Sequence, residues 1–464
     1  MKEFFYTYSE REDLMAIRTD SESFSYKKLF ELSEITARKI ISIISTEQTY
    51  VPILSSNSSE FIITTIALWN LGLVPVPLNT RWTEKEISDV IFKNNLEVIL
   101  FEKEFAVKLN SVRIKKISFD DLFNSHSESF HKKNNDEAVV IFTSGSSAEP
   151  KGVVHTFDSL ANSIMNGGKI LNQSIGDRWL ASLPFYHIGG FQIICRALSS
   201  GCEIIIPTDL RFESIKNSVS NFKPTHISLV AAQLKRLIEE KIKPDKTLKV
   251  CLIGGGFSED NLLIEAARNG WNPIRVYGST ETASFITAAN AEEIIAKPNT
   301  VGRAVDNVRI TISSEGEILI STKSLLKNYL NDEKAINEKI KNDFYHSGDL
   351  GKIDDNEYLF VDAKRTDLIV SGGENINPIE VENALLKIPS IKEACVFPIQ
   401  DEYWGQIVAA ALVINGSIDE EFLKNELKKN LASFKIPKKY FFVNELPKTS
   451  LGKIERDKVR KMFV

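Results

Sequence analysis

The segment IFTSGSSAEPKGVVHTF, residues 141–157, combines features that restrict both the fold and the chemistry of this chain. Apolar residues 138–142 predict the end of a buried strand. After them comes a loop with free backbone N–H groups and several hydroxyls, made of Thr143, Ser144, Gly145, Ser146 and Ser147. Such a loop can surround phosphate oxygens, and Lys151 can supply positive charge. The same composition is also typical of a solvated serine-rich turn, so both interpretations stay open at this point.

The glycine beside Lys151 excludes one well-defined class of phosphate-binding loop. In a Walker A loop, GxxxxGK[ST], a glycine directly precedes the lysine, whereas Gly152 follows Lys151 here. Any role in binding phosphate must therefore be judged together with the other segments of the chain.

Short β-branched runs alternate with helical patterns through most of the chain. Strands are predicted at TYVPILS, LEVILF, AVVIFTS, CEIIIP, HISLV, KVCLIGG and IRVYGS, and helices at SSEFIITTIALWNLG, AAQLKRLIEEK and NLLIEAARN. This alternation indicates an α/β fold with doubly wound, mostly parallel sheets. Hairpin patterns at 309–322 and 351–364 then predict a small antiparallel, barrel-like subdomain.

The length of 464 residues favours more than one domain. After about residue 366 the pattern changes to a helix over 378–388, strands over 393–399 and 407–414, and a helix over 419–431. We therefore expect a large N-terminal domain over residues 1–365 and a small, mobile α+β domain over residues 366–464.

The composition limits the class of protein and its partners. Apolar residues make up 43% and charged residues 26%, as in ordinary globular proteins, and the net charge is -5. The lysines are dispersed, so no nucleic-acid partner is expected. Residues 61–78 are the longest apolar stretch, but Asn70, Gly72 and two prolines favour a buried helix that runs into a strand. The four cysteines lack metal or disulfide spacing, and together with the absence of a signal-peptide pattern they predict a cytoplasmic protein without stable membrane insertion.

The remaining motifs decide between the two interpretations of the opening loop. Seven occur in order: TSGSSAEPKG, LPFYHIGG, GGG at 254–256, YGSTET, YHSGDL, DLIVSGGENINPIEVE and LPKTSLGKIER. Together they resemble those of the adenylate-forming superfamily of acyl-CoA synthetases, adenylation domains and luciferases, from roughly residue 20 to the C-terminus. The resemblance implies that the opening loop holds the β- and γ-phosphates of ATP.

This resemblance implies a two-step reaction with ATP, Mg²⁺ and coenzyme A. A carboxylate resists attack by a thiol because its leaving group would be an oxide, and joining it to AMP supplies a stabilised leaving group. In-line attack on the α-phosphorus releases pyrophosphate, and a thiol then displaces AMP. Such transfers depend mainly on positioning and charge neutralisation.

The resemblance assigns roles in nucleotide binding. Thr280 matches a hydroxyl that contacts phosphate, Glu281 the Mg²⁺ ligand, and Asp349 the acid that accepts the ribose hydroxyls. The Gly254, Gly255 and Gly256 run matches the strand end that contacts adenine, and Tyr277 and Gly278 belong to the same nucleotide motif as Thr280. Without the resemblance, Glu281 would be a helix-terminal carboxylate and the glycine run a tight turn.

The C-terminal motifs imply a moving domain. Lys453 matches the lysine that bridges the carboxylate and the α-phosphate, so its domain must close over the nucleotide. Thr366 matches the hinge, and Gly372 and Gly373 match the turn beside the pantetheine tunnel, where a side chain would obstruct thiol entry. Otherwise Lys453 would be one of many solvated lysines.

The chain departs from the family pattern at two nucleotide-binding positions. Ala148 replaces a usual glycine of the phosphate loop. Before the hinge, Ala363 and Lys364 replace a Gly-Arg pair, and Arg365 follows. Lysine offers a point charge where arginine offers a planar fork, so either Lys364 or Arg365 is expected to contact the ribose.

The acyl site is predicted from the LPFYHIGG segment and its continuation. His187 matches the gate between acyl site and thiol tunnel, and Gly256 and Ser279 are expected to line the acyl site. Arg196 lies in an apolar run, where it either snorkels or faces a partner, for which a second substrate carboxylate is the best candidate. Within the superfamily the chain most resembles the o-succinylbenzoate–CoA ligases of menaquinone synthesis, although Gly189 stands where those usually have serine.

Three alternative functions share these motifs or this fold. The chain could be another aryl- or fatty-acyl-CoA ligase, a stand-alone adenylation enzyme that loads a carrier protein, or a binding module that has kept the fold. A luciferase-like oxidation shares the first half-reaction. Relatives are often homodimers, which the sequence does not test.

Overall fold

The computed structural model describes residues 2–44, 48–123, 135–143, 150–364, 369–371, 374–401, 404–429, 431, 433–449 and 452–464. The chain forms two compact units. The N-terminal unit comprises residues 1–309 and 321–345, and the C-terminal unit comprises residues 310–320 and 346–464. Residues 346–364 therefore group with the C-terminal unit, and the domain boundary expected at 365/366 stays a prediction, because residues 365–368 lie outside the described residues.

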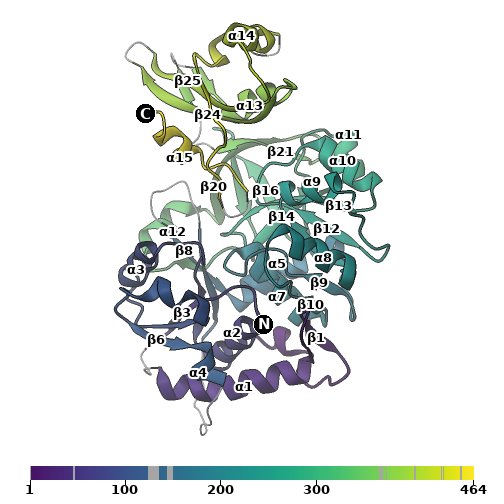
Figure 1. Cartoon of the computed structure of the whole chain (residues 1–464), viewed down its shortest axis with the longest axis vertical. Helices are drawn as coiled ribbons and strands as arrows, with labels where there is room; N and C mark the ends of the chain where they lie inside the picture. Colours follow the sequence, from purple (N-terminus) through teal and green to yellow (C-terminus); the bar gives the residue numbers. More distant parts are fainter. Residues whose placement is uncertain are drawn as a thin grey trace. The chain divides into compact units, whose positions relative to one another are not determined.

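A nine-stranded sheet forms the centre of the N-terminal unit (Figure 1). Its order is β15 (Arg303–Ala304), β14 (Ser284–Asn290), β13 (Pro273–Ser279), β12 (Val250–Ile253), β11 (His226–Leu229), β9 (Arg178–Leu180), β10 (Glu203–Ile205), β1 (Met15–Arg18) and β2 (Ser23–Ser25). The strands from β13 to β1 are parallel, and β2, β14 and β15 add antiparallel edges. The predicted parallel α/β sheet is confirmed.

Helices cover both faces of this sheet, as a doubly wound fold requires. Successive residues of β9 alternate between clusters: Trp179 packs with one face and Leu180 with the other. The cluster around Leu180 contains α8 (Phe212–Phe222), α9 (Ala231–Glu239) and α10 (Asp260–Arg268). The cluster around Trp179 contains α5 (Phe157–Asn166), α7 (Ile188–Ser200) and neighbouring α6 (Gly168–Leu171), and α11 (Ala291–Ala296) follows β14.

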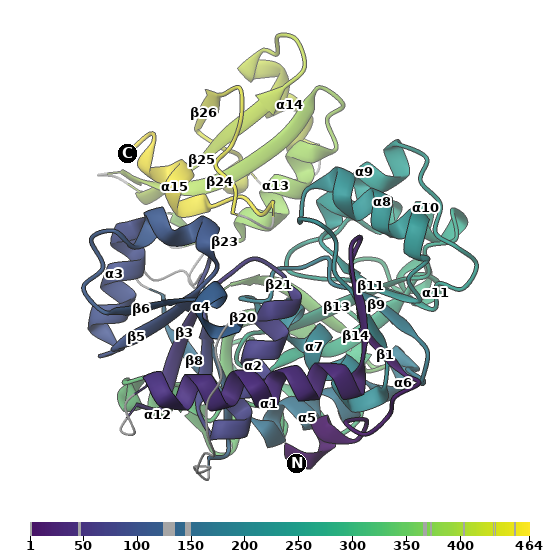
Figure 2. The same cartoon turned by 60° about the horizontal axis from the view of Figure 1, so that its bottom comes forward.

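A second, four-stranded sheet lies between β2 and β9 in the sequence and is entirely parallel. Its order is β4 (Val74–Pro77), β3 (Tyr50–Leu54), β5 (Val98–Phe101) and β6 (Lys115–Ser118). The associated helices are η1 (Lys2–Tyr6), α1 (Tyr26–Ile43), α2 (Ser59–Leu71), α3 (Glu84–Lys93), η2 (Lys103–Leu109) and α4 (Phe119–Phe123). α1 and α2 lie side by side (Figure 2). The apolar stretch at 61–78 is, as predicted, a buried helix that runs into strand β4.

Two further sheets contain antiparallel pairs. β7 (Glu137–Phe142), β8 (Gly152–Thr156) and β18 (Asn328–Tyr329) form one of them. β16 (Arg309–Ile312), β17 (Glu317–Ser321), β20 (Phe344–Ile353), β19 (Ile340–Lys341) and β21 (Leu359–Lys364) form the other, and α12 (Glu333–Lys339) lies between β18 and β19 in sequence. The two predicted hairpins correspond to β16–β17 and β20–β21.

The last hundred residues form the predicted α+β unit. Its sheet has the order β23 (Glu374–Ile376), β22 (Ile369–Ser371), β25 (Gly405–Ile414) and β24 (Ile391–Asp401), with β26 (Lys439–Phe442) parallel to β25. Its helices are α13 (Pro378–Leu386), α14 (Glu420–Lys428), η4 (Ser433–Lys435) and α15 (Arg456–Lys461). α13 begins with the Asn377 cap and Pro378, a favoured pair for starting a helix.

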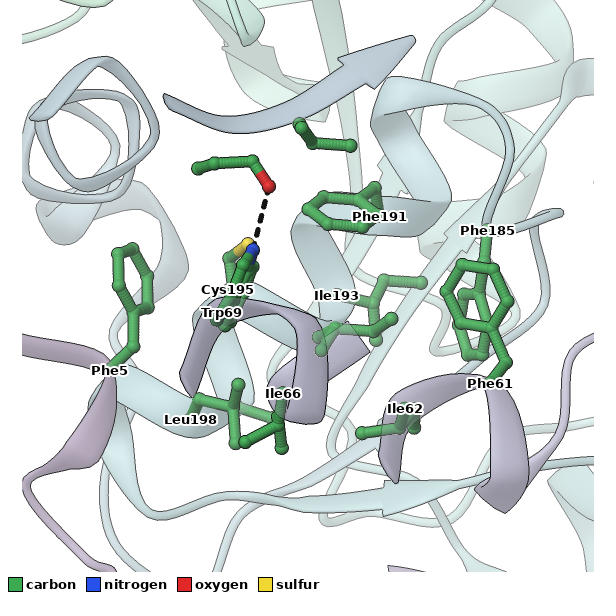
Figure 3. Close-up of a cluster of buried hydrophobic side chains, with 14 of the residues drawn as sticks. Phe5, Phe61, Ile62, Ile66, Trp69, Phe185, Phe191, Ile193, Cys195 and Leu198 are labelled. Atoms are coloured by element: carbon green, nitrogen blue, oxygen red, sulfur yellow. Dashed lines mark hydrogen bonds between the residues drawn. The ribbon is translucent and has the colours of Figure 1, made fainter. Parts of the chain in front are cut away.

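Trp69 is central to the largest buried cluster of the N-terminal unit (Figure 3). Its indole is fully buried and packs against the rings of Phe5, Phe157 and Phe191. The indole Nε1–H donates a 2.7 Å hydrogen bond to the carbonyl of Ala138, on β7. The Trp69 side chain of α2 therefore fixes β7. This strand leads into residues 143–151, the segment predicted to bind phosphate, which we call the phosphate-type loop.

The free thiols of the four cysteines agree with the lack of disulfide spacing in the sequence. Cys195, Cys202, Cys251 and Cys395 are buried and not joined in disulfides. Within the described ranges, every helix is too short or too polar to cross a membrane.

We predict that Trp69→Phe lowers the free energy of unfolding by about 1–3 kcal/mol, because the buried Ala138 carbonyl loses its donor. Trp69→Ala should cost about 3–5 kcal/mol, since it also leaves a cavity. Chemical denaturation measures both changes. The control is Trp404→Phe, at a side chain that is 42% exposed, which should stay within about 0.5 kcal/mol of the parent. Equal effects at the two positions would contradict this account of the core.

Candidate active site

The carboxyl ends of neighbouring parallel strands bring several predicted segments to one edge of the nine-stranded sheet. β9 leads into the LPFYHIGG loop, β12 into Gly254–Gly256, and β13 contains Tyr277 and Gly278 and leads into Thr280. β12 and β13 pair directly, with Ile253 opposite Arg275. In open α/β sheets this edge is where ligands bind.

Gly278 is required by a close backbone approach, and Gly254 packs tightly against a neighbouring side chain. A Cβ atom on Gly278 would lie 2.1 Å from the carbonyl oxygen of Ser284, at a point where the pairing of β13 and β14 shifts register. A Cβ on Gly254 would lie 2.9 Å from Val276 Cγ2. Gly255 has φ +78°, whereas a Cβ on Gly256 would meet open space. The glycine run therefore combines a structural requirement at its start with a bare backbone surface at its end.

The turn that carries Thr280 and Glu281 is held from several sides. Thr282 Oγ1 accepts from Ser279 N at 2.9 Å, and Ala283 has φ +56°, an unusual conformation for a residue with a side chain. The fully buried His155 of β8 donates from Nε2 to the carbonyl of Thr280 at 2.7 Å. The Glu281 carbonyl accepts from Leu326 N at 2.8 Å. The backbone at both predicted phosphate and metal ligands is thus fixed by long-range contacts.

The Glu281 carboxylate suits a cation that takes most of its ligands from phosphate oxygens and water. Its Oε1 accepts a 3.2 Å hydrogen bond from the Tyr329 hydroxyl. Among the residues that the structure describes, no three His, Cys, Asp or Glu side chains are grouped to hold a metal. Mg²⁺ typically binds one or two carboxylates together with phosphate oxygens and water, so a lone carboxylate fits it.

The phosphate-type loop closes a hairpin between β7 and β8. Phe142 pairs with Gly152, and Thr143 N donates to the Lys151 carbonyl at 2.9 Å. Lys151 Nζ lies 3.6 Å from Asp332 Oδ2 and 5.4 Å from the centre of the Tyr329 ring. Ser144, Gly145, Ser146, Ser147 and Ala148 lie outside the described residues.

The LPFYHIGG loop is clamped by Asn57, a residue that precedes α2. Asn57 Nδ2 donates to the carbonyls of Ala181 and Leu183 at 3.1 and 2.8 Å, and its Oδ1 accepts from Phe185 N at 2.9 Å. A Cβ on Gly190 would lie 2.0 Å from the Pro184 carbonyl oxygen, so this glycine lets the first turn of α7 pack on the loop.

His187 lies at the N-terminus of α7 with its Nε2 atom buried and without a hydrogen-bond partner. Burial lowers the pKa of His187 to about 4, and the charge of Arg81 acts in the same direction. His187, Thr143, Pro150 and Trp82 are among the residues that line a small, partly open pocket of about 40 Å³. The predicted gate is therefore a neutral imidazole in a pocket that reaches both ends of the phosphate-type loop.

Arg196 is buried in the core of the N-terminal unit, with 2% exposure. Its Nη2 donates to Ser284 Oγ at 3.0 Å, while Nε has no partner. The guanidinium lies 5.4 Å from the Trp179 ring centre and 5.5 Å from that of Phe285, and among the described residues no carboxylate oxygen comes within 4.0 Å of it. Burial lowers the pKa of Arg196 to about 10, which still leaves it charged at neutral pH.

Gln192 stands one helical turn before Arg196 and faces the same turn of chain. Gln192 Nε2 donates to the Ala283 carbonyl at 2.8 Å, while Gln192 Oε1 and the nearby predicted residue Ser279 have buried side-chain oxygens without partners. Unpaired buried polar atoms usually indicate a ligand or water that completes them. This arrangement supports an acyl site near residues 279–284.

Asp349 belongs to the C-terminal unit, on β20, in a turn braced by Glu317. Glu317 Oε1 accepts from Gly348 N at 2.9 Å, and Glu317 Oε2 lies 3.0 Å from His346 Nδ1. Asp349 N donates to Ser347 Oγ at 3.0 Å. Asp349 is also paired through its backbone with Lys364 of β21, which places the Lys364 backbone beside the predicted ribose ligand.

The other C-terminal residues are only partly described. Lys453 is exposed, and its backbone is fixed by Thr449, which donates to the Lys453 carbonyl at 2.7 Å. Arg365, Thr366, Gly372 and Gly373 lie outside the described residues, between or beside strands β21, β22 and β23. The roles of these residues stay predictions.

Several residues around the site were missed by reasoning from sequence, namely Asn57, His155, Gln192, Glu317, Tyr329 and Asp332. Each acts on a predicted segment through a contact far away in the chain, as His155 does on Thr280 over 125 positions. The one local signal was polarity within buried segments: His155 in strand VVHT and Gln192 in helix FQIICRAL.

Sequence comparisons cover nearly the whole chain. Residues 4–330 match the family described as AMP-binding enzyme, and residues 380–453 match the AMP-binding enzyme C-terminal domain. The chain is 31% identical over 463 residues to the 2-succinylbenzoate–CoA ligase of Bacillus licheniformis, with 96% of each covered. It is 31% identical over 448 residues to the 2-succinylbenzoate–CoA ligase of Listeria innocua, with 94% of each covered.

Solved structures give the same picture. The o-succinylbenzoate CoA synthetase of Bacillus subtilis, in complex with its acyl-adenylate intermediate, matches with a TM-score of 0.92 and 28% identity, covering 98% of this chain and 97% of that one. ATP-bound MatB of Rhodopseudomonas palustris matches with a TM-score of 0.89 and 23% identity, covering 100% and 99%, which is a likeness of fold alone.

The buried histidines predict a loss of stability in mild acid. Burial lowers the pKa of His155 and of His187 to about 4, below their ordinary value of 6.5. As pH falls through 6.5 the unfolded chain takes up these protons first, so the free energy of unfolding decreases between pH 6.5 and about 4. By linkage each histidine should remove about 2 kcal/mol between pH 7.5 and 5.0.

Urea denaturation at these two pH values tests this. His155→Gln keeps a donor for the Thr280 carbonyl but does not titrate, so its pH-dependent loss should be smaller than the parent's by about 2 kcal/mol. An identical loss in parent and variant would show that His155 is not responsible.

Proposed function

This chain belongs to the AMP-binding enzyme family, and on that premise we propose that it joins 2-succinylbenzoate to coenzyme A with ATP. The observation that carries the proposal is the meeting of Gly254–Gly256 with Tyr277–Glu281 at one sheet edge, in a chain similar over nearly its whole length to 2-succinylbenzoate–CoA ligases. The products are the acyl-CoA thioester, AMP and pyrophosphate.

In the first step a carboxylate oxygen of the acid attacks the α-phosphorus of ATP. The bond between the α-phosphorus and the bridging oxygen breaks, and pyrophosphate leaves with its electron pair. Adenine would lie between Tyr277 and the bare backbone at Gly255 and Gly256. Thr280 would donate a hydrogen bond to phosphate, and the phosphate-type loop with Lys151 would hold the leaving pyrophosphate.

The Glu281 carboxylate would hold Mg²⁺ in this step. When bound, the ion supplies charge neutralisation at the phosphate oxygens. The protein's contribution is an anchored carboxylate in a turn that His155 and Thr282 hold rigid.

Asp349 and Lys453 would act from the C-terminal unit. The Asp349 carboxylate would accept both ribose hydroxyls, and either Lys364 or Arg365 would contact the same sugar. Lys453 would donate between the attacking carboxylate and the α-phosphate, where negative charge increases in the transition state. This role requires the C-terminal unit to deliver Lys453 during the first step only.

In the second step the thiol of coenzyme A attacks the acyl carbonyl and AMP leaves. The thiol proton is lost to solvent as the C–S bond forms and the bond from the acyl carbon to the AMP oxygen breaks. The His187 side chain is neutral, so it can move between the acyl site and the thiol path without moving a charge. Gly372 and Gly373 would leave the path open to pantetheine.

Arg196 provides the argument for a dicarboxylic acid. A buried guanidinium without a carboxylate partner is costly, because aromatic rings replace only part of its lost hydration. A second carboxylate on the substrate would accept a hydrogen bond from the unpaired Nε and form a charge-assisted pair with the guanidinium. 2-Succinylbenzoate carries two carboxylates, one to be activated and one to be held.

The direct test measures pyrophosphate release with a panel of acids, with and without coenzyme A. We expect adenylate formation with 2-succinylbenzoate, and AMP release only after coenzyme A is added. Turnover with benzoate or fatty acids but not with 2-succinylbenzoate would refute the substrate. Release of AMP that required a carrier protein instead of coenzyme A would refute the acceptor.

Lys453→Ala should separate the two half-reactions. The variant should lose at least about 100-fold in the rate of adenylate formation, because a charged donor to the transition state is removed. It should keep thioester formation from preformed acyl-adenylate, which stopped-flow or quenched assays measure. Equal losses in both half-reactions would contradict domain alternation.

Arg196→Met should abolish selection for the second carboxylate. The matched pair of substrates is 2-succinylbenzoate and 4-oxo-4-phenylbutanoate, which lacks the ring carboxylate. The parent should prefer the first by about 10- to 100-fold in kcat/KM, and Arg196→Met should reduce this preference to near unity.

Thermal unfolding provides an independent check on Arg196. Without substrate, Arg196→Met should be as stable as the parent or more stable, because it removes an uncompensated buried charge. Stabilisation by 2-succinylbenzoate should decrease. A destabilised variant that kept full substrate preference would identify Arg196 as a structural residue.

A further inference from the structure

We infer that Tyr329 is a positioning residue that sets the orientation of the Glu281 carboxylate and of Lys151 for the metal–nucleotide complex. The inference rests on the proposed function, in which Glu281 holds Mg²⁺ and Lys151 contacts phosphate. Tyr329 itself touches neither nucleotide nor acid in this account.

The Tyr329 side chain reaches both charged groups at once. Its hydroxyl donates to Glu281 Oε1 at 3.2 Å, and its ring lies under Lys151, with Nζ 5.4 Å from the ring centre. The residue is buried, with 3% exposure. A single rigid ring thus connects the loop predicted to hold phosphates with the side chain predicted to hold the metal.

The backbone of Tyr329 is fixed by the same two segments that its side chain contacts. Tyr329 pairs with Val153 on β8, and Leu330 N donates to the Gly152 carbonyl at 2.7 Å, one residue after Lys151. Leu326 N donates to the Glu281 carbonyl at 2.8 Å. A Cβ on Gly152 would lie 3.1 Å from Leu330 Cβ, so the two strands approach closely. Residues 326–330, which include β18, therefore tie both segments into one rigid unit.

The direction of the hydrogen bond follows from the chemistry of its two groups. A carboxylate has no proton to donate, whereas a phenol hydroxyl can donate one. The Tyr329 hydroxyl is therefore the donor and Glu281 Oε1 the acceptor. Oε1 is oriented by this donation, and Oε2 is left to bind a cation.

Asp332 completes the arrangement on the other side of Lys151. Its Oδ2 lies 3.6 Å from Lys151 Nζ, while its Oδ1 accepts from Ala335 N at 3.1 Å and caps α12. Both partners of this ion pair are about two-fifths exposed, at 43% and 42%, so it is weak and can yield to phosphate. The Tyr329 ring, in contrast, stays beneath the lysine in either case.

Tyr329→Phe tests the inference because it removes one oxygen and keeps the ring. Electron paramagnetic resonance of Mn²⁺ with the full-length protein and α,β-methylene-ATP measures metal affinity directly, without turnover. We expect about tenfold weaker Mn²⁺ binding, typical of a lost hydrogen bond to a charged group. In adenylate formation, the Mg²⁺ concentration for half-maximal rate should rise similarly, with KM for 2-succinylbenzoate unchanged.

Tyr50→Phe is the matched control. Tyr50 also donates from its hydroxyl to a carboxylate, Glu137 Oε2, at 2.8 Å, but Glu137 has no proposed role in the reaction. This variant should bind Mn²⁺ as the parent does. Tyr329→Leu removes the ring as well, so it should also weaken binding of the nucleotide without metal, which Tyr329→Phe should not.

Glu281→Gln separates failure of this inference from failure of the proposed function. If Glu281→Gln keeps the parent's Mn²⁺ affinity, the metal role of Glu281 is wrong. If Glu281→Gln weakens binding while Tyr329→Phe does not, only the positioning role is overturned. Tyr329→Phe added to Glu281→Gln should cause no further loss of metal affinity, and additive losses would also overturn the inference.

Discussion

The close approach of Gly278 to the Ser284 carbonyl is the constraint on which the N-terminal half of the site depends. With no room for a Cβ atom, the chain leaves β13, turns through residues 279–283 and returns as β14 within hydrogen-bonding distance. The turn places Thr280 and Glu281 at the carboxyl edge of the sheet. His155, Gln192 and Leu326 then fix its carbonyls from three different elements. A rigid backbone allows short side chains to meet a polyanionic ligand without loss of conformational entropy on binding.

Polar groups are buried around this turn without full compensation, and this is informative about the substrate. Arg196 has an unpaired Nε, Gln192 an unpaired Oε1, and both lie on one face of α7 against residues 283–284. In an ordinary core such groups would be replaced by apolar side chains, since burying them unpaired is unfavourable. Their presence is consistent with a site that is less stable when empty, because its hydrogen bonds are completed only when an acid substrate binds.

The predicted catalytic groups are divided between the two compact units. Thr280 and Glu281 belong to the N-terminal unit, and Asp349 and Lys453 to the C-terminal unit. Glu317 braces the Asp349 turn within its own unit, just as Tyr329 braces Glu281 within the other. Glu281 and Asp349 are therefore each held by contacts within their own unit.

The sequence by itself determined the order of strands and helices, the α/β class and the location of the motifs, because strand and helix periodicities and glycine-rich turns are local properties. It also identified Arg196 as a charge in an apolar run and Lys151 as a charge beside a hydroxyl-rich loop, whereas Thr280 and Glu281 were assigned through the resemblance of their motif to the family. Only the tertiary structure decided which groups support them: Asn57 on the LPFYHIGG loop, His155 on Thr280, Tyr329 on Glu281 and Lys151. These contacts join residues up to 178 positions apart, as Tyr329 and Lys151 are, and no local pattern encodes the distance between two side chains that meet only when separate strands pair.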